Sequence, residues 1–228
     1  MEALRQRGFQ GITLRELLAA WDGAPAPWPR PVVLTFDDGL RSVATEAAPV
    51  LREMGFRATV FAVAGRCGTD NQWAGQAAWA PRQDLLTAGD LATLVREGWE
   101  VGAHGLTHAA LPGLTEAGRE DEVVTSKRVL ETQLGSEVTS FAYPYGLADR
   151  GVRALVGRHY QAACSTELAT AQRRGDRHWL PRIDAFYVRR PELLRLLETT
   201  AGRAYLAARS LGRRLRRAVP LARGRAEG

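Results

Sequence analysis

The feature that most constrains the fold is a regular alternation of short apolar runs with amphipathic stretches along most of the chain. Continuous runs rich in β-branched and aromatic residues are typical of buried strands. The clearest of these lie at 31–36, 58–63, 99–103 and 137–142, and weaker ones at 160–164 and 179–183. Strand–helix alternation at this spacing predicts an α/β fold with parallel strands.

Helical patterns fill the intervals and carry their own end signals. Thr87, with Asp90 three residues later, predicts the start of a helix that ends near Gly98, and Thr115 predicts the start of a long helix that ends at Gly135. Further helices are expected at 42–54 and from about 191, and the stretch 64–86 is expected to be an irregular insertion.

Composition and charge restrict the class of protein. The 228 residues, 45% of them hydrophobic, are enough for one large domain or two small ones. No run approaches the 18 apolar residues of a membrane-spanning helix. The net charge of +6 is concentrated in residues 201–228, which hold eight arginines and one acid, so the first 200 residues are close to neutral. We therefore expect a domain at 1–200 and an arginine-rich tail at 201–228, either solvated or weakly attracted to an anionic membrane or polymer.

The cysteines and the first residues bear on the cellular compartment. Cys67 and Cys164 lie far apart without CxxC spacing, which excludes a disulfide framework and a cysteine-based zinc site. Two free buried thiols are expected, and a single disulfide is left open. The first residues lack the apolar core of a secretory signal. This favours the cytoplasm or the cytoplasmic face of the membrane, unless the true start lies upstream.

Polar residues cluster directly after two of the predicted strands. Asp37 and Asp38 follow the first strand, and Asp38 with Gly39 could simply form a common loop turn. However, two adjacent carboxylates raise the pKa of one of the pair unless a cation or another partner lies nearby. His104 and His108 follow the third strand, and histidines four residues apart in a helical turn can reach one metal ion. Either cluster alone is a weak signal.

A third cluster, the aromatic turn 141–146, follows the fourth strand. In βα-barrels the carboxyl ends of the strands converge on one site, so the three clusters would face one another. One aspartate and two histidines then form a nitrogen, nitrogen and oxygen donor set that leaves coordination positions open for water and substrate.

Together these motifs resemble the polysaccharide deacetylases with the NodB homology domain (carbohydrate esterase family 4). The resemblance covers nearly all of residues 9–190, and both the motif order and the 66 residues between Asp38 and His104 fit. The motifs are Thr-Phe-Asp-Asp-Gly at 35–39, His-Gly-Leu-Thr-His at 104–108, a helix with Glu122 and Ser126-Lys127, and Phe-Ala-Tyr-Pro-Tyr-Gly at 141–146. The resemblance implies a distorted (β/α) barrel of about seven strands, whose first strand is missing if the true start lies upstream.

The same resemblance implies roles for individual residues. Asp38, His104 and His108 would bind a divalent metal ion, with zinc preferred. Asp37 would be the general base that deprotonates the metal-bound water, and the backbone N–H of Tyr145 would help to hold the oxyanion. The expected substrate contacts are Tyr143, Pro144, Tyr145, Trp73 and Trp79.

Two further roles are affected by departures from the family pattern. Many members carry an arginine where this chain has Ala142, and Arg182 is similar to an arginine that members with this variant carry late in the domain. We expect Arg182 to pair with Asp37, the alternative being a surface arginine. The family's general acid is a histidine, for which His178 is the first candidate and His159 the second; the alternative is that the acid lies upstream of this sequence.

These residues predict a metal-dependent hydrolase that removes N-acetyl groups from amino sugars of a polysaccharide or a glycan precursor. An O-acetyl esterase or a non-sugar amidase would use the same site, and a carbohydrate-binding module with a decayed site is the alternative from another class. An acetylated amino-sugar glycan is the expected partner; nucleic acid is not, since the tail has no interleaved aromatic residues. Trp73 and Trp79 are candidates for stacking on a sugar, whereas Trp99 is expected in the core.

Overall fold

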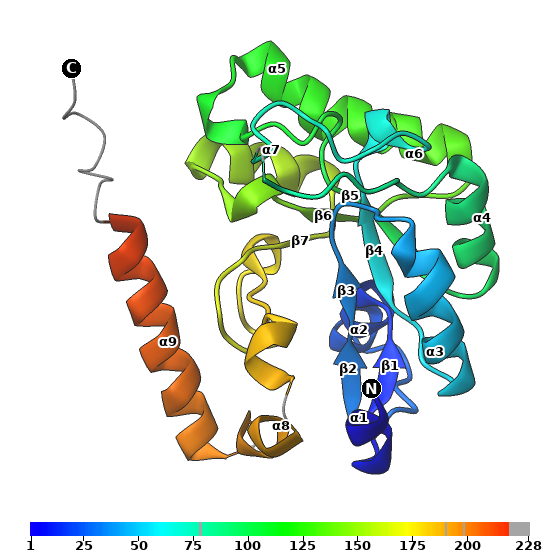
Figure 1. Cartoon of the computed structure of the whole chain (residues 1–228). Coiled ribbons are helices and arrows are strands. Elements are labelled where there is room, and N and C mark those ends of the chain that lie inside the picture. Colours follow the sequence, from blue (N-terminus) through cyan, green and yellow to red (C-terminus); the bar gives the residue numbers. More distant parts are fainter. Residues whose placement is uncertain (78, 190, 198, 219–228) are drawn as a thin grey trace. The chain divides into compact units, whose positions relative to one another are not determined.

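A computed structural model describes residues 1–218 apart from 78, 190 and 198 (Figure 1). The chain divides into two compact units. The first comprises Met1–Ser165 with Asp176–Trp179, and the second comprises Thr166–Gly175 with the chain from Leu180 onward. The domain limits of 1–200 and 201–228 stay a prediction.

The first unit is built on a sheet of five parallel strands whose spatial order follows their order in the chain. They are β3 (Thr35–Phe36), β4 (Thr59–Ala62), β5 (Glu100–Ala103), β6 (Ser140–Ala142) and β7 (Ala162–Cys164). Every residue of β4 to β7 is buried. A singly wound parallel sheet with helical connections is the arrangement of a curled half-barrel, which confirms the predicted α/β barrel class.

The run predicted as one strand at 31–36 serves two sheets. Its first half, β2 (Pro31–Val33), pairs in parallel with β1 (Gln10–Ile12), and its second half is β3. The break lies at Leu34, whose carbonyl accepts from the backbone N–H of Thr59 at 2.9 Å. Before Leu34 the chain therefore pairs with β1, and after Leu34 it pairs with β4.

Helices precede and connect the strands of this unit (Figure 1). They are α1 (Glu2–Gln6), α2 (Leu14–Trp21), α3 (Ala48–Glu53), α4 (Ala88–Arg96), α5 (Glu116–Glu120), α6 (Ser126–Leu134) and α7 (Arg150–His159). The predicted signals hold: Thr87 and Asp90 form a capping box, Thr115 accepts from the backbone N–H of Gly118, and Gly135 ends α6 with a φ of 63°.

Two of the predicted helices contain a π turn that no periodicity indicates. One π turn, η4 (Asp121–Thr125), joins α5 to α6 within the helix predicted between Thr115 and Gly135, and the other, η1 (Val43–Ala47), precedes α3. Such turns are rare, and they are found often at functional sites. Each lies in the first long helical segment after a loop with predicted site residues, η1 after the loop of Asp38 and η4 after the loop of His108.

The strand predicted at 179–183 is wrong. Residues Arg177–Trp179 form a short 3₁₀ helix, η6, begun by Asp176, whose side chain accepts from the N–H of His178 at 2.8 Å. Pro181 follows and has no N–H to give to a sheet. The strand predicted at 137–142 is shorter than expected, because Val138 donates its N–H to Glu131 of α6 and pairing starts at Ser140.

The insertion at 64–86 is irregular, as predicted. It contains a 3₁₀ helix, η2 (Ala64–Arg66), and single antiparallel bridges from Leu40 to Leu85 and from Asp70 to Asp84.

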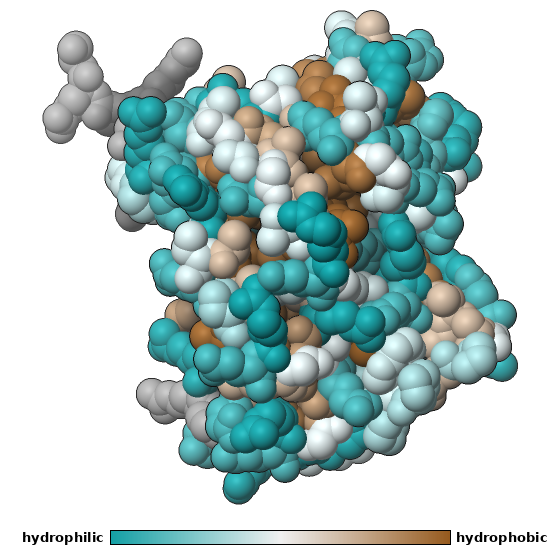
Figure 2. All heavy atoms as spheres, turned by 90° about the vertical axis from the view of Figure 1, so that its right-hand side faces the viewer, coloured by the Kyte–Doolittle hydropathy of each residue, from teal (hydrophilic) through white to brown (hydrophobic). Residues whose placement is uncertain are grey.

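On the face drawn in Figure 2, hydrophilic side chains cover most of the surface and hydrophobic ones show only between them. Among the described residues no helix is both long and apolar enough to cross a membrane.

The second unit has a small core of its own. Leu168, Tyr187 and Leu206 are buried together, with Ile183 and Tyr205 packed against them. Its helices are η7 (Ala185–Val188), α8 (Pro191–Leu197) and α9 (Thr200–Ala218). The backbone of the arginine-rich segment is thus helical up to 218, and the arginines at 223 and 225 lie outside the described residues.

Candidate metal and catalytic site

Three loops at the carboxyl ends of β3, β5 and β6 supply the predicted site residues. Asp38, His104 and His108 lie so close that one ligand atom of each falls within 4.8 Å of the others. The Nε2 atoms of His104 and His108 each lie 3.3 Å from Oδ1 of Asp38. The structure thus brings together the three predicted ligands, which are separated by up to 70 residues in the chain.

The His104 ring is fixed by a backbone carbonyl. Its Nδ1 lies 2.7 Å from the carbonyl oxygen of Ala142 on β6, in a fully buried contact. Because a carbonyl only accepts, Nδ1 carries a proton, and Nε2 is the ring nitrogen that faces Asp38. Metal-binding histidines are commonly oriented in this way.

The His108 ring packs between aromatic side chains. Its centroid lies 4.2 Å from that of Trp73 and 4.6 Å from that of Tyr145. Trp73 is 7% exposed and belongs to a buried cluster with Val63 and Leu85. Within the described part of the chain, Nδ1 of His108 is buried without a hydrogen-bond partner. The orientation of His108 therefore depends on ring packing and on its loop.

The same loops hold three residues with left-handed backbone. Asp38, His108 and Tyr145 have φ values of 69°, 68° and 58°, and no other described residue except glycine has a positive φ. Aspartate and histidine tolerate this conformation better than tyrosine does. Such strain persists only where the surroundings enforce it, and it concentrates at functional sites. This observation singles out the predicted loops independently of their side chains.

Charge and burial oppose one another within the cluster. Burial acts to raise the pKa of Asp38, but hydrogen bonds from His104 and His108 outweigh it and hold that pKa well below its usual value. Burial acts to lower the pKa of His104, but Asp38 and the charge of Asp37 raise it; in His108 burial prevails and the pKa is lowered. The site therefore offers an ionised carboxylate and at least one neutral imidazole.

Asp37, the predicted base, is half-buried beside the cluster, and its charge acts on both histidines. Tyr145 is 38% exposed at the rim. Tyr143 and Pro144 are buried, and the Tyr143 hydroxyl donates to the backbone carbonyl of His178 at 2.8 Å. The structure thus places Asp37 and Tyr145 near the cluster and the Tyr143 side chain in the core.

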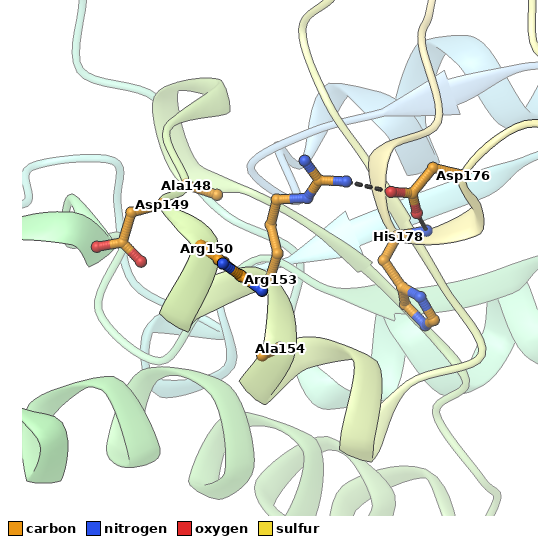
Figure 3. Close-up of a pocket in the computed structure, with 7 residues that line it drawn as sticks. All are labelled: Ala148, Asp149, Arg150, Arg153, Ala154, Asp176 and His178. Atoms are coloured by element: carbon orange, nitrogen blue, oxygen red, sulfur yellow. Dashed lines mark hydrogen bonds and ion pairs between the residues drawn. The ribbon is translucent and has the colours of Figure 1, made fainter.

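His178, the candidate acid, lines an open pocket of about 560 Å³ over the first turns of α7 (Figure 3). Its Nε2 lies 2.9 Å from the Tyr160 carbonyl and so donates to it. Asp176 in the same pocket pairs with Arg153. His178 is not among the clustered ligands, and its role stays a prediction, as does that of His159.

The remaining predicted residues are dispersed. Arg182 lies in the second unit, where its N–H donates to the carbonyl of Glu167 at 2.9 Å, and its pairing with Asp37 stays a prediction. Trp79 is 87% exposed in the insertion, and Trp99 is buried, as expected. Cys67 and Cys164 are both free; Cys164 is buried, whereas Cys67 is only half-buried.

Sequence reasoning missed the groups that hold the histidine loop. Glu122 contributes only a motif position to the resemblance, yet its side chain accepts from the backbone N–H of Leu106 and Thr107. The backbone N–H groups of Ala64 and Gly65 donate to the carbonyls of Gly105 and Leu106 at 3.0 and 2.8 Å. The one signal in the sequence was the place of Glu122 directly before Val123, on a helix predicted to pack against the core.

Comparison with known proteins agrees with this geometry. The sequence profile of the family described as polysaccharide deacetylase matches residues 25–162, more than half of the chain. The Bacillus subtilis (strain 168) protein YxkH, which is named as a polysaccharide deacetylase by inference, is 26% identical to this chain over 174 residues. The match covers 76% of this chain and 58% of YxkH, so the chain spans less than two thirds of that relative.

Solved structures show the same fold. IcaB from Ammonifex degensii is 26% identical, with a TM-score of 0.67 over 80% of this chain and 79% of that one. The Streptococcus pyogenes deacetylase PplD, solved in complex with acetate, has a TM-score of 0.70 at 22% identity, over 80% of this chain and 76% of that one. At that identity the second likeness supports the fold alone. By its profile match and its distorted barrel, the chain belongs to the polysaccharide deacetylase family.

Proposed function

We propose that this chain is a metal-dependent hydrolase that removes N-acetyl groups from amino sugars of a polysaccharide or a glycan precursor. The observation that carries the proposal is the convergence of Asp38, His104 and His108 beside Asp37 at the carboxyl edge of the sheet. Adjacent chain positions would then serve different roles, Asp38 as a cation ligand and Asp37 as a proton acceptor.

The residues fit a divalent cation. Two imidazole nitrogens and one carboxylate oxygen form a donor set that suits zinc and leaves positions open for other ligands. The proton on Nδ1 of His104 keeps its Nε2 available, and the low pKa of Asp38 keeps the carboxylate ionised. A bound divalent cation supplies Lewis-acid polarisation of a carbonyl group and lowers the pKa of water.

The chain's own residues supply the proton transfer and the orientation. Asp37 accepts the proton that water gives up as it attacks the acetamide carbonyl, since Asp38 is engaged with the histidines and Asp37, directly after β3, lies beside them. The backbone N–H of Tyr145, which lies in the left-handed turn after β6, would be the donor for the oxyanion. As the C–N bond breaks, the departing nitrogen takes up a proton, from the predicted acid His178 or from Asp37, and acetate and a free amine are the products.

Asp37→Asn tests the chemistry. We expect the variant to keep zinc and to lose roughly 10²- to 10⁴-fold in acetate release from N-acetylglucosamine oligomers, because it lacks the base but retains the ligands. Zinc content and acetate release are measured on the same preparations. Zinc-loaded wild type that releases acetate only from O-acetylated sugars would transfer the proposal to an esterase, and release from neither would contradict it.

A further inference from the structure

The histidine loop, residues 104–108, is held from two sides by groups outside it. On one side its carbonyls at Gly105 and Leu106 accept from the amides that begin η2. On the other, Glu122 accepts from the N–H of Leu106 at 2.9 Å, from the N–H of Thr107 at 3.1 Å and from the Thr107 hydroxyl at 2.5 Å. Consecutive backbone groups of the loop are thus paired.

Glu122 is 4% exposed, and burying a carboxylate costs free energy unless donors surround it. The donors that surround this one belong to the loop, 15 and 16 residues away in sequence. The contact is also close enough to exclude a side chain at Gly105, where a Cβ would lie 2.5 Å from Oε2 of Glu122. Carboxylate and loop are therefore fitted to one another.

Glu122 lies in the π turn η4, which is stabilised by side-chain hydrogen bonds to its backbone. A π turn leaves a carbonyl of the helix available, and the carbonyl of Val123 accepts from the Tyr160 hydroxyl at 2.8 Å and from the Ser126 hydroxyl at 3.0 Å. Val123, Ser126 and Tyr160 are all buried. The turn is thus held by Ser126 and by Tyr160, which lies two residues before β7.

The two histidines depend on this support to different degrees. His104 has anchors of its own, because its N–H donates to Ala62 at 2.8 Å and its ring donates to Ala142. His108 directly follows Thr107, has a φ of 68°, and has no partner for Nδ1 in the described part of the chain. Loss of the Glu122 contacts would therefore release His108 more than His104.

From these contacts we infer that Glu122 is a positioning residue, which sets the affinity of the Asp38–His104–His108 cluster for a divalent cation by holding His108 through Thr107. The inference rests on the proposed metal site. Removal of a residue that orients a metal ligand commonly weakens metal binding by about 10- to 100-fold.

The test compares zinc dissociation constants, measured by competition with a chromophoric chelator, for folded wild type, Glu122→Ala and Glu122→Gln. We expect the Kd to rise about 10- to 100-fold in Glu122→Ala. In Glu122→Gln it should stay within about threefold of wild type, since the amide oxygen accepts from the two N–H groups and the amide nitrogen donates to the Thr107 hydroxyl. The visible spectrum of the Co²⁺-loaded protein should change in Glu122→Ala and be restored in Glu122→Gln.

Glu131→Ala is the matched control, because Glu131 lies on the same helix, accepts from Val138 and pairs with Lys127, away from the loop. Its Kd should equal that of wild type. If Glu122→Ala does not fold, Thr107→Val replaces it, with an expected rise of several-fold. An unchanged Kd and Co²⁺ spectrum in Glu122→Ala or Thr107→Val, with zinc lost from His104→Ala, overturns the role of Glu122 alone. A wild type that binds no zinc overturns the metal site as well.

Discussion

Two buried glutamates stand at opposite ends of β5 and show how the same group serves different purposes. At the amino end, Glu100 accepts from the Ser140 hydroxyl at 2.6 Å, the Thr59 hydroxyl at 3.0 Å and the N–H of Arg15 at 2.7 Å. At the carboxyl end, Glu122 accepts from the loop that follows the strand. Both side chains are 4% exposed.

The difference lies in what each carboxylate ties together. The partners of Glu100 begin α2, β4 and β6, which are elements of the scaffold, whereas the partners of Glu122 adjoin His108. In barrels of this kind the amino ends of the strands carry stability and the carboxyl ends carry the chemistry. Burial of a charge therefore says little about function until its partners are identified.

Glu100→Ala should give the largest loss of stability without a change at the site. Three donors from three elements would lose their acceptor in the interior, and we expect the free energy of unfolding to fall by about 3 kcal/mol. Chemical denaturation measures the fall, and zinc titration of the folded fraction should give the wild-type Kd. A large rise in the zinc Kd of Glu100→Ala would contradict the distinction between a stabilising amino end and a metal-binding carboxyl end of β5.

Gly105→Ala should affect the carboxyl end more selectively. The φ of 80° and the 2.5 Å approach to Glu122 both oppose a methyl group, so the loop or the carboxylate must shift. We expect a roughly tenfold rise in the zinc Kd and a loss of about 1–2 kcal/mol in the free energy of unfolding. Gly113→Ala is the control, because nothing lies within 4 Å of its added methyl group.

Tyr160→Phe should give the smallest effect and probe the π turn. Removing the hydroxyl leaves the Val123 carbonyl with Ser126 alone, which we expect to cost about 1 kcal/mol of unfolding free energy. If η4 sets the position of Glu122, the zinc Kd should also rise about two- to threefold. A loss of stability with an unchanged Kd would show that η4 and the metal site are independent.

Much of the fold could be predicted because its signals are local. The strands β4, β5 and β7 lie within the stretches predicted as strands at 58–63, 99–103 and 160–164, and Thr87 with Asp90 gives a start signal within four residues. The strand predicted at 179–183 failed where Asp176 begins a tight turn and Pro181 interrupts pairing. The division of residues 31–36 into β2 and β3 at Leu34 depends on which strands they pair with, and no local sequence pattern indicates that pairing.

The site divides in the same way. Asp38, His104 and His108 could be predicted to converge, because each follows a strand of one parallel sheet. The part played by Glu122 could not, because its contact with Thr107 spans 15 residues and depends on a π turn. The packing of Trp73 on His108 could not be predicted either, because it joins an irregular insertion to a loop and neither segment has a periodic sequence pattern.

The most direct test is the zinc content of the purified wild-type chain compared with His104→Ala and His108→Ala. We expect one zinc per wild-type chain and its loss from both folded variants, because both Nε2 atoms lie 3.3 Å from the same carboxylate oxygen. A wild type that binds no zinc after incubation with the metal, or variants that retain it, would contradict the claim that these three residues form the metal site.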